Sequence, residues 1–127
     1  MTKIMVVDDE ADITFIIKET LTREGYDVIV ANSGKDALEK IRDAAPDLVL
    51  LDVMMPDLDG WETCKQIKAD EDMKDTIVTM LTVKSEDEDK VKSFDYALAD
   101  WHINKPIDRK KLVKTVKWLL TKPIKRA

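Results

Sequence analysis

Five polar residues of this chain stand at the ends of short segments rich in apolar residues, and their side chains could together handle a phosphoryl group. Asp8 and Asp9 follow one apolar run, Asp52 a second and Thr82 a third, while Lys105 closes a short segment before a proline. Three carboxylates, a hydroxyl and an ammonium can hold a divalent cation and a phosphoryl group. Four such ends with complementary chemistry predict one assembled site.

The elements that must position these residues are visible in the apolar pattern, which alternates between short runs and helical stripes. The expected strands cover residues 3–7, 28–31, 48–51, 77–81 and about 101–104. The expected helices carry these apolar stripes: Ile13, Ile16, Ile17 and Leu21; Ala37, Leu38, Ile41 and Ala45; Trp61, Cys64 and Ile67; Val91, Phe94 and Leu98; Leu112, Val113, Val116, Leu119 and Leu120. The pattern therefore predicts five βα units in succession.

Residues that start and stop helices fall where these stripes begin and end. Ser33, Ser85 and Asp108 are expected N-caps, Gly25 is a typical residue just past a helix, and Pro123 lies beyond the last stripe. Strict βα alternation implies a parallel sheet with helices on both faces and right-handed crossovers. In an open sheet of this α/β class, ligands bind beyond the carboxyl ends of the strands, where the five polar residues fall.

The composition narrows the classes of function. The chain has 127 residues, a net charge of −5 and a pI near 4.9, so direct binding to nucleic acid is not expected. The longest apolar run is far below the ~18 residues of a membrane span, so we expect no membrane association. The single Cys64 cannot form an internal disulfide, and a reduced thiol indicates a cytoplasmic protein.

We expect one domain over residues 1–121, followed by a short basic tail at 122–127. This length leaves no room for a DNA-binding or enzymatic output domain after Leu120. The chain is then either a single-domain protein or a piece of a longer one.

Four segments form an ordered set of motifs: IMVVDDE at 4–10, LLDVMMPDLDG at 50–60, MLT at 80–82 and NKP at 104–106. In order and separation they resemble the receiver domain of two-component response regulators, and the resemblance covers nearly the whole chain. Each motif alone is weak evidence, whereas the ordered set is specific. The resemblance implies a flavodoxin-like, doubly wound (βα)5 sandwich with strand order 2-1-3-4-5, of the chemotaxis-type or stand-alone kind.

The resemblance also implies what the polar residues do with phosphate. Asp52 would accept a phosphoryl group from a phosphohistidine on a sensor histidine kinase. Thr82 would turn toward the phosphoryl group as a switch, and Lys105 would contact it. The peptide bond between Lys105 and Pro106 is expected to be cis. The protein would then signal through phosphorylation-dependent binding to other proteins.

By the same resemblance, Asp8 and Asp9 bind Mg²⁺ together with Asp52 and the backbone carbonyl of Met54. The chemistry is consistent, because clustered carboxylates repel one another and a hard divalent ion relieves the repulsion. Few protein ligands leave open positions for water and phosphate oxygen, which suits Mg²⁺, and Mn²⁺ should substitute.

Several positions depart from the family pattern. His102 stands three residues before the lysine, where the family has an aromatic residue that rotates inward with the switch. Leu98 stands where the family often has Gly, and it is expected to fill the stripe of the fourth helix. Met54 and Lys84 occupy positions that tune autodephosphorylation in the family.

The surface of helix four, strand five and helix five is the family's usual output and dimer face. Tyr96 is expected to face outward on it. Trp118 lies off the apolar stripe of the last helix, so it either covers a neighbouring surface with its ring or anchors a partner. The expected partners are a sensor histidine kinase and either a downstream protein or a second copy of the chain.

Two other functions are compatible with parts of this pattern. A metal-dependent phosphohydrolase with an aspartyl-phosphate intermediate typically carries a second Asp two residues after the nucleophile, where this chain has Met54. A flavin-binding module needs Gly, Ser or Thr after the first strand, and the loop there is acidic. Asp57 and Asp59 resemble a fragment of a calcium loop, but the remaining ligands are absent, so they are read as turn residues.

Overall fold

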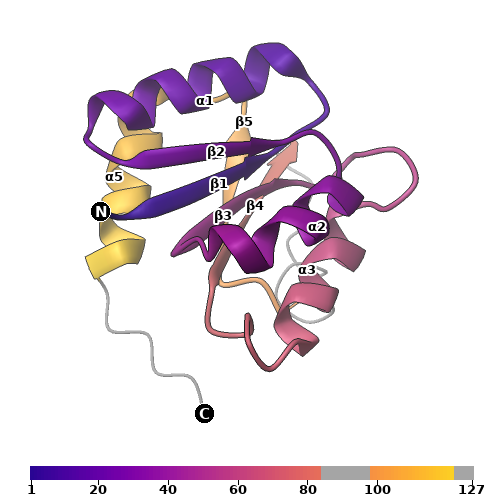
Figure 1. Ribbon diagram of the computed structural model, residues 1–127. Coiled ribbons are helices and arrows are strands. Elements are labelled where there is room, and N and C mark those ends of the chain that lie inside the picture. Colours follow the sequence, from indigo (N-terminus) through magenta and orange to yellow (C-terminus); the bar gives the residue numbers. More distant parts are fainter. Residues whose placement is uncertain (84–97, 122–127) are drawn as a thin grey trace.

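The computed structural model describes residues 1–83 and 98–121, and Figure 1 shows their arrangement. Five parallel strands form one sheet in the order β2-β1-β3-β4-β5, which confirms the predicted fold class and strand order. The strands are β1 Lys3–Val7, β2 Asp27–Ala31, β3 Leu48–Asp52, β4 Ile77–Val83 and β5 Trp101–Lys105.

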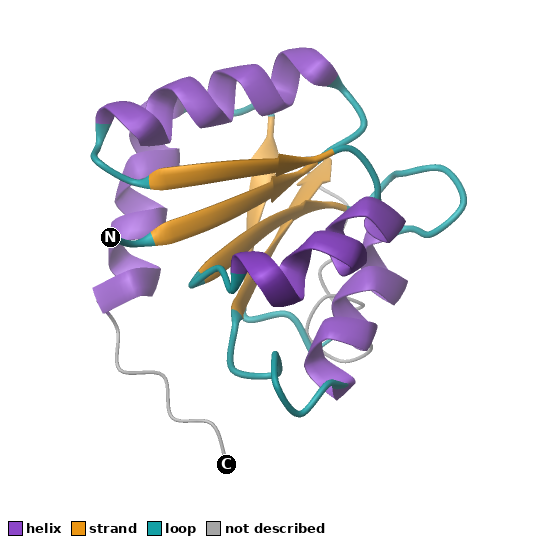
Figure 2. Ribbon diagram, in the orientation of Figure 1, coloured by secondary structure: helices purple, strands orange, loops and turns teal. Residues whose placement is uncertain are grey.

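Helices cover both faces of the sheet, with α1 and α5 on one face and α2 and α3 on the other (Figure 2). Their bounds are α1 Ala11–Arg23, α2 Gly34–Ala44, α3 Gly60–Ala69 and α5 Arg109–Thr121. None of the helices within the described ranges is long and apolar enough to cross a membrane. The helix expected between β4 and β5 lies outside the described residues, as do Ser85, Val91, Phe94, Lys84, Tyr96 and the tail 122–127.

Two apolar clusters, one on each face of the sheet, join these layers. Ile4 and Leu50 pack toward α1 and α5, whereas Met5 and Leu51 pack toward α2 and α3. Successive side chains of a strand point to opposite faces, so a central strand covered on both sides needs apolar residues at every position. This accounts for the uninterrupted apolar runs in β1 and β3.

The predicted helix boundaries are largely confirmed. The Ser33 hydroxyl accepts a hydrogen bond from the Asp36 N–H at 3.0 Å, and Asp108 Oδ1 accepts one from the Lys111 N–H at 3.1 Å. These side chains satisfy N–H groups that have no partner inside the first helical turn. Gly25, with φ of 93°, leaves α1 in a backbone conformation that residues with a Cβ rarely adopt.

Two members of the predicted apolar stripes do not face the core. Ala45 is exposed and ends α2 with φ of 46°, because the following Pro46 disfavours a helical conformation at the residue before it. Leu98 has φ of 61° and is 59% exposed, so the prediction that it fills a buried stripe is wrong. A left-handed turn at this position agrees with the Gly that the family often has there.

Candidate functional site

The predicted site residues lie together at the carboxyl edge of the sheet. Asp52 is the last residue of β3 and Lys105 the last of β5, while Thr82 is the next to last of β4. Asp8 and Asp9 follow β1 directly. Because all strands are parallel, these five residues from four strand ends converge on one edge.

Three carboxylates form the centre of this site. One oxygen each from Asp8, Asp9 and Asp52 lies within 4.8 Å of the other two. Asp8 and Asp52 are buried, whereas Asp9 is exposed at the mouth. Asp8 Oδ1 also accepts a hydrogen bond from the Glu10 N–H at 2.9 Å, which fixes the turn into α1.

Lys105 reaches across the sheet edge to two of these carboxylates. Its Nζ lies 3.0 Å from Asp52 Oδ1 and 3.1 Å from Asp8 Oδ2, with Glu10 Oε1 further away at 3.9 Å. Its peptide bond to Pro106 is cis, as the family resemblance implied. Among the described residues, one ammonium therefore faces a cluster of three carboxylates, which is an excess of negative charge.

The electrostatics of the site follow from burial and this excess of acid. Burial raises the pKa of Asp52, and the charges of Asp8 and Asp9 raise it further, although the hydrogen bond from Lys105 acts in the opposite direction. Burial alone would lower the pKa of Lys105, but its bonds to Asp52 and Asp8 outweigh that effect and the pKa is raised. The acidic neighbours thus favour the charged form of Lys105, whereas burial and the neighbouring carboxylates disfavour the ionised form of Asp52.

The donor set fits a hard divalent cation. Mg²⁺ prefers oxygen ligands and is usually bound by one or two carboxylates plus water and phosphate oxygen. Three carboxylates within 4.8 Å of one another, with one of them open to solvent, match that preference.

Thr82 lies buried beside the cluster, and its hydroxyl donates a hydrogen bond to Asn104 Oδ1 at 3.0 Å. Asn104 was not identified from the sequence as a site residue. The sequence signal that could have identified it is its place in the Asn-Lys-Pro motif, next to Lys105. In the structure, the register of β4 and β5 pairs Thr82 directly with Asn104.

Gly60 brings the first turn of α3 against the end of β3. A Cβ at Gly60 would lie 2.2 Å from the backbone oxygen of Asp52, so only glycine permits this approach. Asp59 caps α3 by accepting a hydrogen bond from the Glu62 N–H at 2.9 Å, and Asp57 has φ of 68°. Asp57 is therefore a turn residue, as predicted, and Asp59 has a capping role that was not predicted.

Comparison with known proteins agrees with this geometry. The family model for the response regulator receiver domain matches residues 4–117.

The chain belongs to the response regulator receiver domains. It is 43% identical over 118 residues to the alkaline phosphatase synthesis transcriptional regulatory protein PhoP of Bacillus subtilis, a match that covers 93% of this chain. The match covers 48% of PhoP, so this chain spans about half the length of that relative.

Solved structures show the same fold. The chemotaxis protein CheY4 of Vibrio cholerae is 32% identical with a TM-score of 0.87, over 92% of this chain and 97% of CheY4. A response regulator from Chloroflexus aurantiacus is 30% identical with a TM-score of 0.91, over 95% of this chain and 98% of that one. The receiver domain of a histidine kinase from Syntrophus aciditrophicus is 31% identical with a TM-score of 0.86, over 100% of this chain and 99% of that domain.

Receiver domains are signalling switches that histidine kinases phosphorylate on an aspartate, and they bind Mg²⁺ in an acidic pocket. This receiver domain has the acidic pocket at the expected strand ends.

Aromatic residues of the receiver domain lie along β5 and α5. The rings of Trp101 and Trp118 meet edge to face, with centroids 4.9 Å apart, and are 38% and 42% exposed. Trp118 thus covers a neighbouring surface, the first of the two roles considered for it, and still presents part of its ring to solvent. His102 is half-buried, and its ring stacks on Trp101 with centroids 6.0 Å apart.

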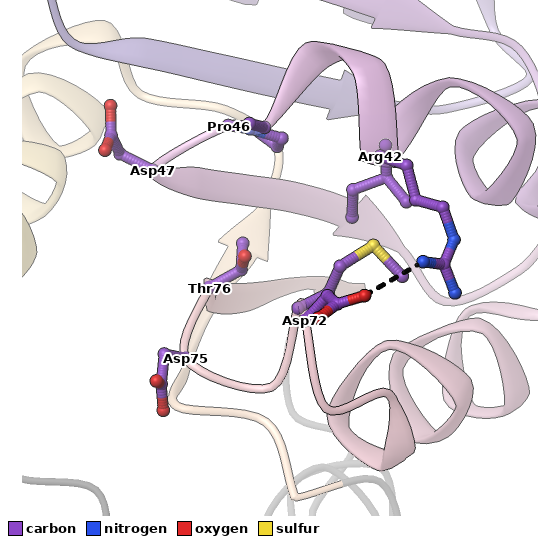
Figure 3. Close-up of a pocket in the computed structure, with 9 residues that line it drawn as sticks. Arg42, Pro46, Asp47, Asp72, Asp75 and Thr76 are labelled. Atoms are coloured by element: carbon purple, nitrogen blue, oxygen red, sulfur yellow. Dashed lines mark hydrogen bonds and ion pairs between the residues drawn. The ribbon is translucent and has the colours of Figure 1, made fainter.

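Two further features lie apart from the site. Burial raises the pKa of the Cys64 thiol to about 12, so it is a core residue and not a nucleophile. A cavity of about 420 Å³ lies near the amino-terminal ends of β3 and β4, where Arg42 points toward Asp72 (Figure 3). It contains none of the predicted site residues.

Proposed function

We propose that Asp52 of this receiver domain accepts a phosphoryl group from a sensor histidine kinase in a Mg²⁺-dependent step. The observation that carries this assignment is the pairing of a buried carboxylate with a lysine at the carboxyl edge of the sheet. Asp52 Oδ1 accepts a hydrogen bond from Lys105, and two further carboxylates adjoin it.

The transfer requires an in-line nucleophile and stabilisation of charge on the phosphoryl oxygens. A carboxylate oxygen of Asp52 attacks phosphorus, so an O–P bond forms. The N–P bond of the phosphohistidine breaks, and the imidazole leaves with the electron pair. The Lys105 ammonium, 3.0 Å from Asp52 Oδ1, is placed to bind a phosphoryl oxygen.

Asp8, Asp9 and Asp52 would hold the Mg²⁺ ion, together with the backbone carbonyl of Met54. When bound, the ion neutralises the carboxylates and the charge of the incoming phosphate. Mn²⁺ has similar preferences for oxygen ligands and should support the same step. Met54 is 71% exposed and follows β3 two residues after Asp52.

We further propose that the domain acts as a switch and is not an enzyme. In the alternative, a phosphohydrolase, the residue two positions after the nucleophile is an acid. The exposed thioether of Met54 cannot donate or accept that proton. Retention of the phosphoryl group on Asp52 is therefore favoured over continuous turnover of a phosphomonoester.

The output surface is proposed to lie on β5 and α5. Exposed aromatic rings are favoured anchors for protein partners, and Trp101 and Trp118 form a connected pair there. Phosphorylation would draw the Thr82 hydroxyl toward the site and be sensed through His102 in β5. The partner would be a downstream protein or a second copy of the domain. Tyr96, also assigned to this surface, lies outside the described residues.

Large exposed apolar side chains are candidate contacts for a protein partner such as the kinase. Phe15 in α1 and Met54 after β3 are large, exposed apolar side chains on segments that leave the carboxyl edge of the sheet. We propose that residues 1–121 form the whole receiver domain and that the kinase contacts it through these two side chains.

Incubation with Mg²⁺ and acetyl phosphate, followed by intact mass measurement, tests the assignment. The wild-type domain should gain one phosphoryl group, and the Asp52→Ala variant none. Magnesium should be required, and a chelator should abolish the gain. Equal labelling of Asp52→Ala, or sustained turnover of a phosphomonoester by the wild type, would refute the proposal.

A further inference from the structure

The buried hydroxyl of Thr82 is already engaged in this structure. It donates a 3.0 Å hydrogen bond to Oδ1 of Asn104, on the neighbouring strand. The register of β4 and β5 places the two residues side by side, so the contact follows from sheet geometry. Threonine has one hydroxyl proton to donate, so it cannot serve two acceptors fully at once.

The two residues differ in their access to water. Thr82 is buried, whereas Asn104 is exposed. If Thr82 turns away, the amide oxygen of Asn104 regains a water molecule at little cost. The hydroxyl, by contrast, must find another acceptor in the interior. A phosphoryl group on Asp52 supplies that acceptor, and hydrogen bonds to charged groups are the stronger kind.

We propose that Asn104 is a positioning residue for the switch: it holds the Thr82 hydroxyl away from the phosphoryl site until a phosphoryl group competes for it. This inference rests on the proposed function, because the competing acceptor is the phosphoryl group on Asp52. The bond to Asn104 opposes the turning of Thr82 toward the phosphoryl group by the free energy of one hydrogen bond. It lowers the affinity for a phosphoryl group and keeps the unmodified domain in its resting state.

The magnitude follows from ordinary hydrogen-bond energetics. A neutral hydrogen bond of about 1 kcal/mol corresponds to roughly a fivefold change in an equilibrium constant. Removing the Asn104 acceptor should therefore strengthen binding of a phosphoryl mimic by roughly fivefold. The change must disappear when Thr82 has no hydroxyl, because Asn104 acts through that group.

The test is a double-mutant cycle with beryllofluoride, which has the shape and charge of a phosphoryl group, in the presence of Mg²⁺. The variants are Asn104→Ala, Thr82→Val and the double variant. Asn32→Ala is the matched control, because Asn32 is an exposed asparagine that follows β2, the strand at the other edge of the sheet. Asn104→Ala should bind the mimic roughly fivefold more tightly, and Asn32→Ala should match the wild type.

In the Thr82→Val background, adding Asn104→Ala should change the affinity by less than about 1.5-fold, since neutral sites usually add to within a few tenths of a kcal/mol. Equal effects in both backgrounds, or weaker binding by Asn104→Ala alone, would overturn the proposal. If wild type fails to bind beryllofluoride while remaining folded, the proposed function itself is refuted. The two failures are therefore distinguishable.

A second readout needs neither metal nor mimic. The side-chain rotamer of Thr82 can be followed by methyl NMR of the metal-free domain. Wild type should show one dominant χ1 rotamer, and Asn104→Ala should show averaging among rotamers. An unchanged Thr82 rotamer in Asn104→Ala would also overturn the role of Asn104.

Discussion

Two largely buried lysines, at opposite ends of the sheet, show how one type of ion pair can serve either function or structure. Lys105, at the carboxyl edge, is 18% exposed and faces Asp8 and Asp52. Lys68, in α3, is 6% exposed and lies 2.7 Å from Asp100. Its ammonium also donates to the backbone oxygen of Thr76 at 2.7 Å, close to the start of β4.

The difference lies in the balance of charge. Within the part of the chain that the structure describes, the Lys68 ammonium meets one carboxylate, and Asp100 also accepts from the Val78 N–H at 2.8 Å. Around Lys105, again counting only residues 1–83 and 98–121, one ammonium meets a cluster of three carboxylates. A balanced buried pair holds segments together, whereas an acidic excess leaves a site that gains from binding a cation. Charge balance, more than burial, separates the two lysines.

The largest change in the free energy of unfolding is expected from breaking the ion pair of Lys68 and Asp100. Lys68→Met should lower the free energy of unfolding by roughly 3 kcal/mol, because it removes the Lys68 ammonium from the mostly buried Asp100 carboxylate. Urea unfolding measures the change. Lys110→Met, at an exposed lysine of α5, is the control and should stay within about 0.5 kcal/mol of wild type. A loss below 1 kcal/mol for Lys68→Met would remove the contrast between the two sites.

At the carboxyl edge of the sheet, by contrast, we expect a substitution to raise the free energy of unfolding. The pKa of Asp52 is raised in the folded protein, so the folded state holds more protons than the unfolded state between the two pKa values. Stability therefore falls as pH rises from about 4, the unfolded value, and the deficit remains at neutral pH. Asp52→Asn removes the charge and should stabilise the metal-free domain at pH 7 by about 1 kcal/mol.

Urea unfolding at pH 4 and pH 7 measures this effect, and the gain should shrink toward pH 4. Millimolar Mg²⁺ should then stabilise wild type more than Asp52→Asn, because it binds the folded carboxylate cluster. A destabilised Asp52→Asn at pH 7 without Mg²⁺ would show that the site carries no electrostatic strain.

The smallest change in stability is expected at a buried hydroxyl away from the carboxylate cluster. Thr79 in β4 is buried, and among the described residues its hydroxyl has no hydrogen-bond partner. Thr79→Val keeps the shape and removes the unsatisfied group, so it should stabilise by roughly 0.5 to 1 kcal/mol. Thr63→Val is the matched control, because that buried hydroxyl donates to the Asp59 backbone oxygen at 2.8 Å, and its loss should destabilise. Thermal unfolding that gives both variants the same sign would contradict this account.

The sequence predicted the parts of the molecule that depend on local pattern. Apolar runs located the five strands, and Ser33 and Asp108 were correctly expected to cap helices. The site residues could be grouped because parallel strands carry their ends to one edge. Ala45 was misplaced because a left-handed helix end before proline interrupts the apolar period.

Contacts that depend on packing between distant segments were not predicted. The pair of Lys68 and Asp100 joins residues 32 positions apart, and nothing in their local sequence distinguishes them from exposed charges. Trp118 could be placed off its stripe, but its contact with Trp101 depends on how α5 lies against β5. The bond between Thr82 and Asn104 needs the register of two strands, which a single sequence does not fix.

The contacts of Lys105 also bear on how the domain is made. Its ammonium bonds to Asp8, 97 residues earlier in the chain, and to Asp52, 53 residues earlier. During synthesis amino-terminal segments emerge from the ribosome first, so Asp8 and Asp52 are released well before this lysine. A growing chain therefore carries the acidic cluster without its cation until β5 has left the exit tunnel. The cluster of Asp8, Asp52 and Lys105 is therefore complete only after β5 has been released and has paired with β4.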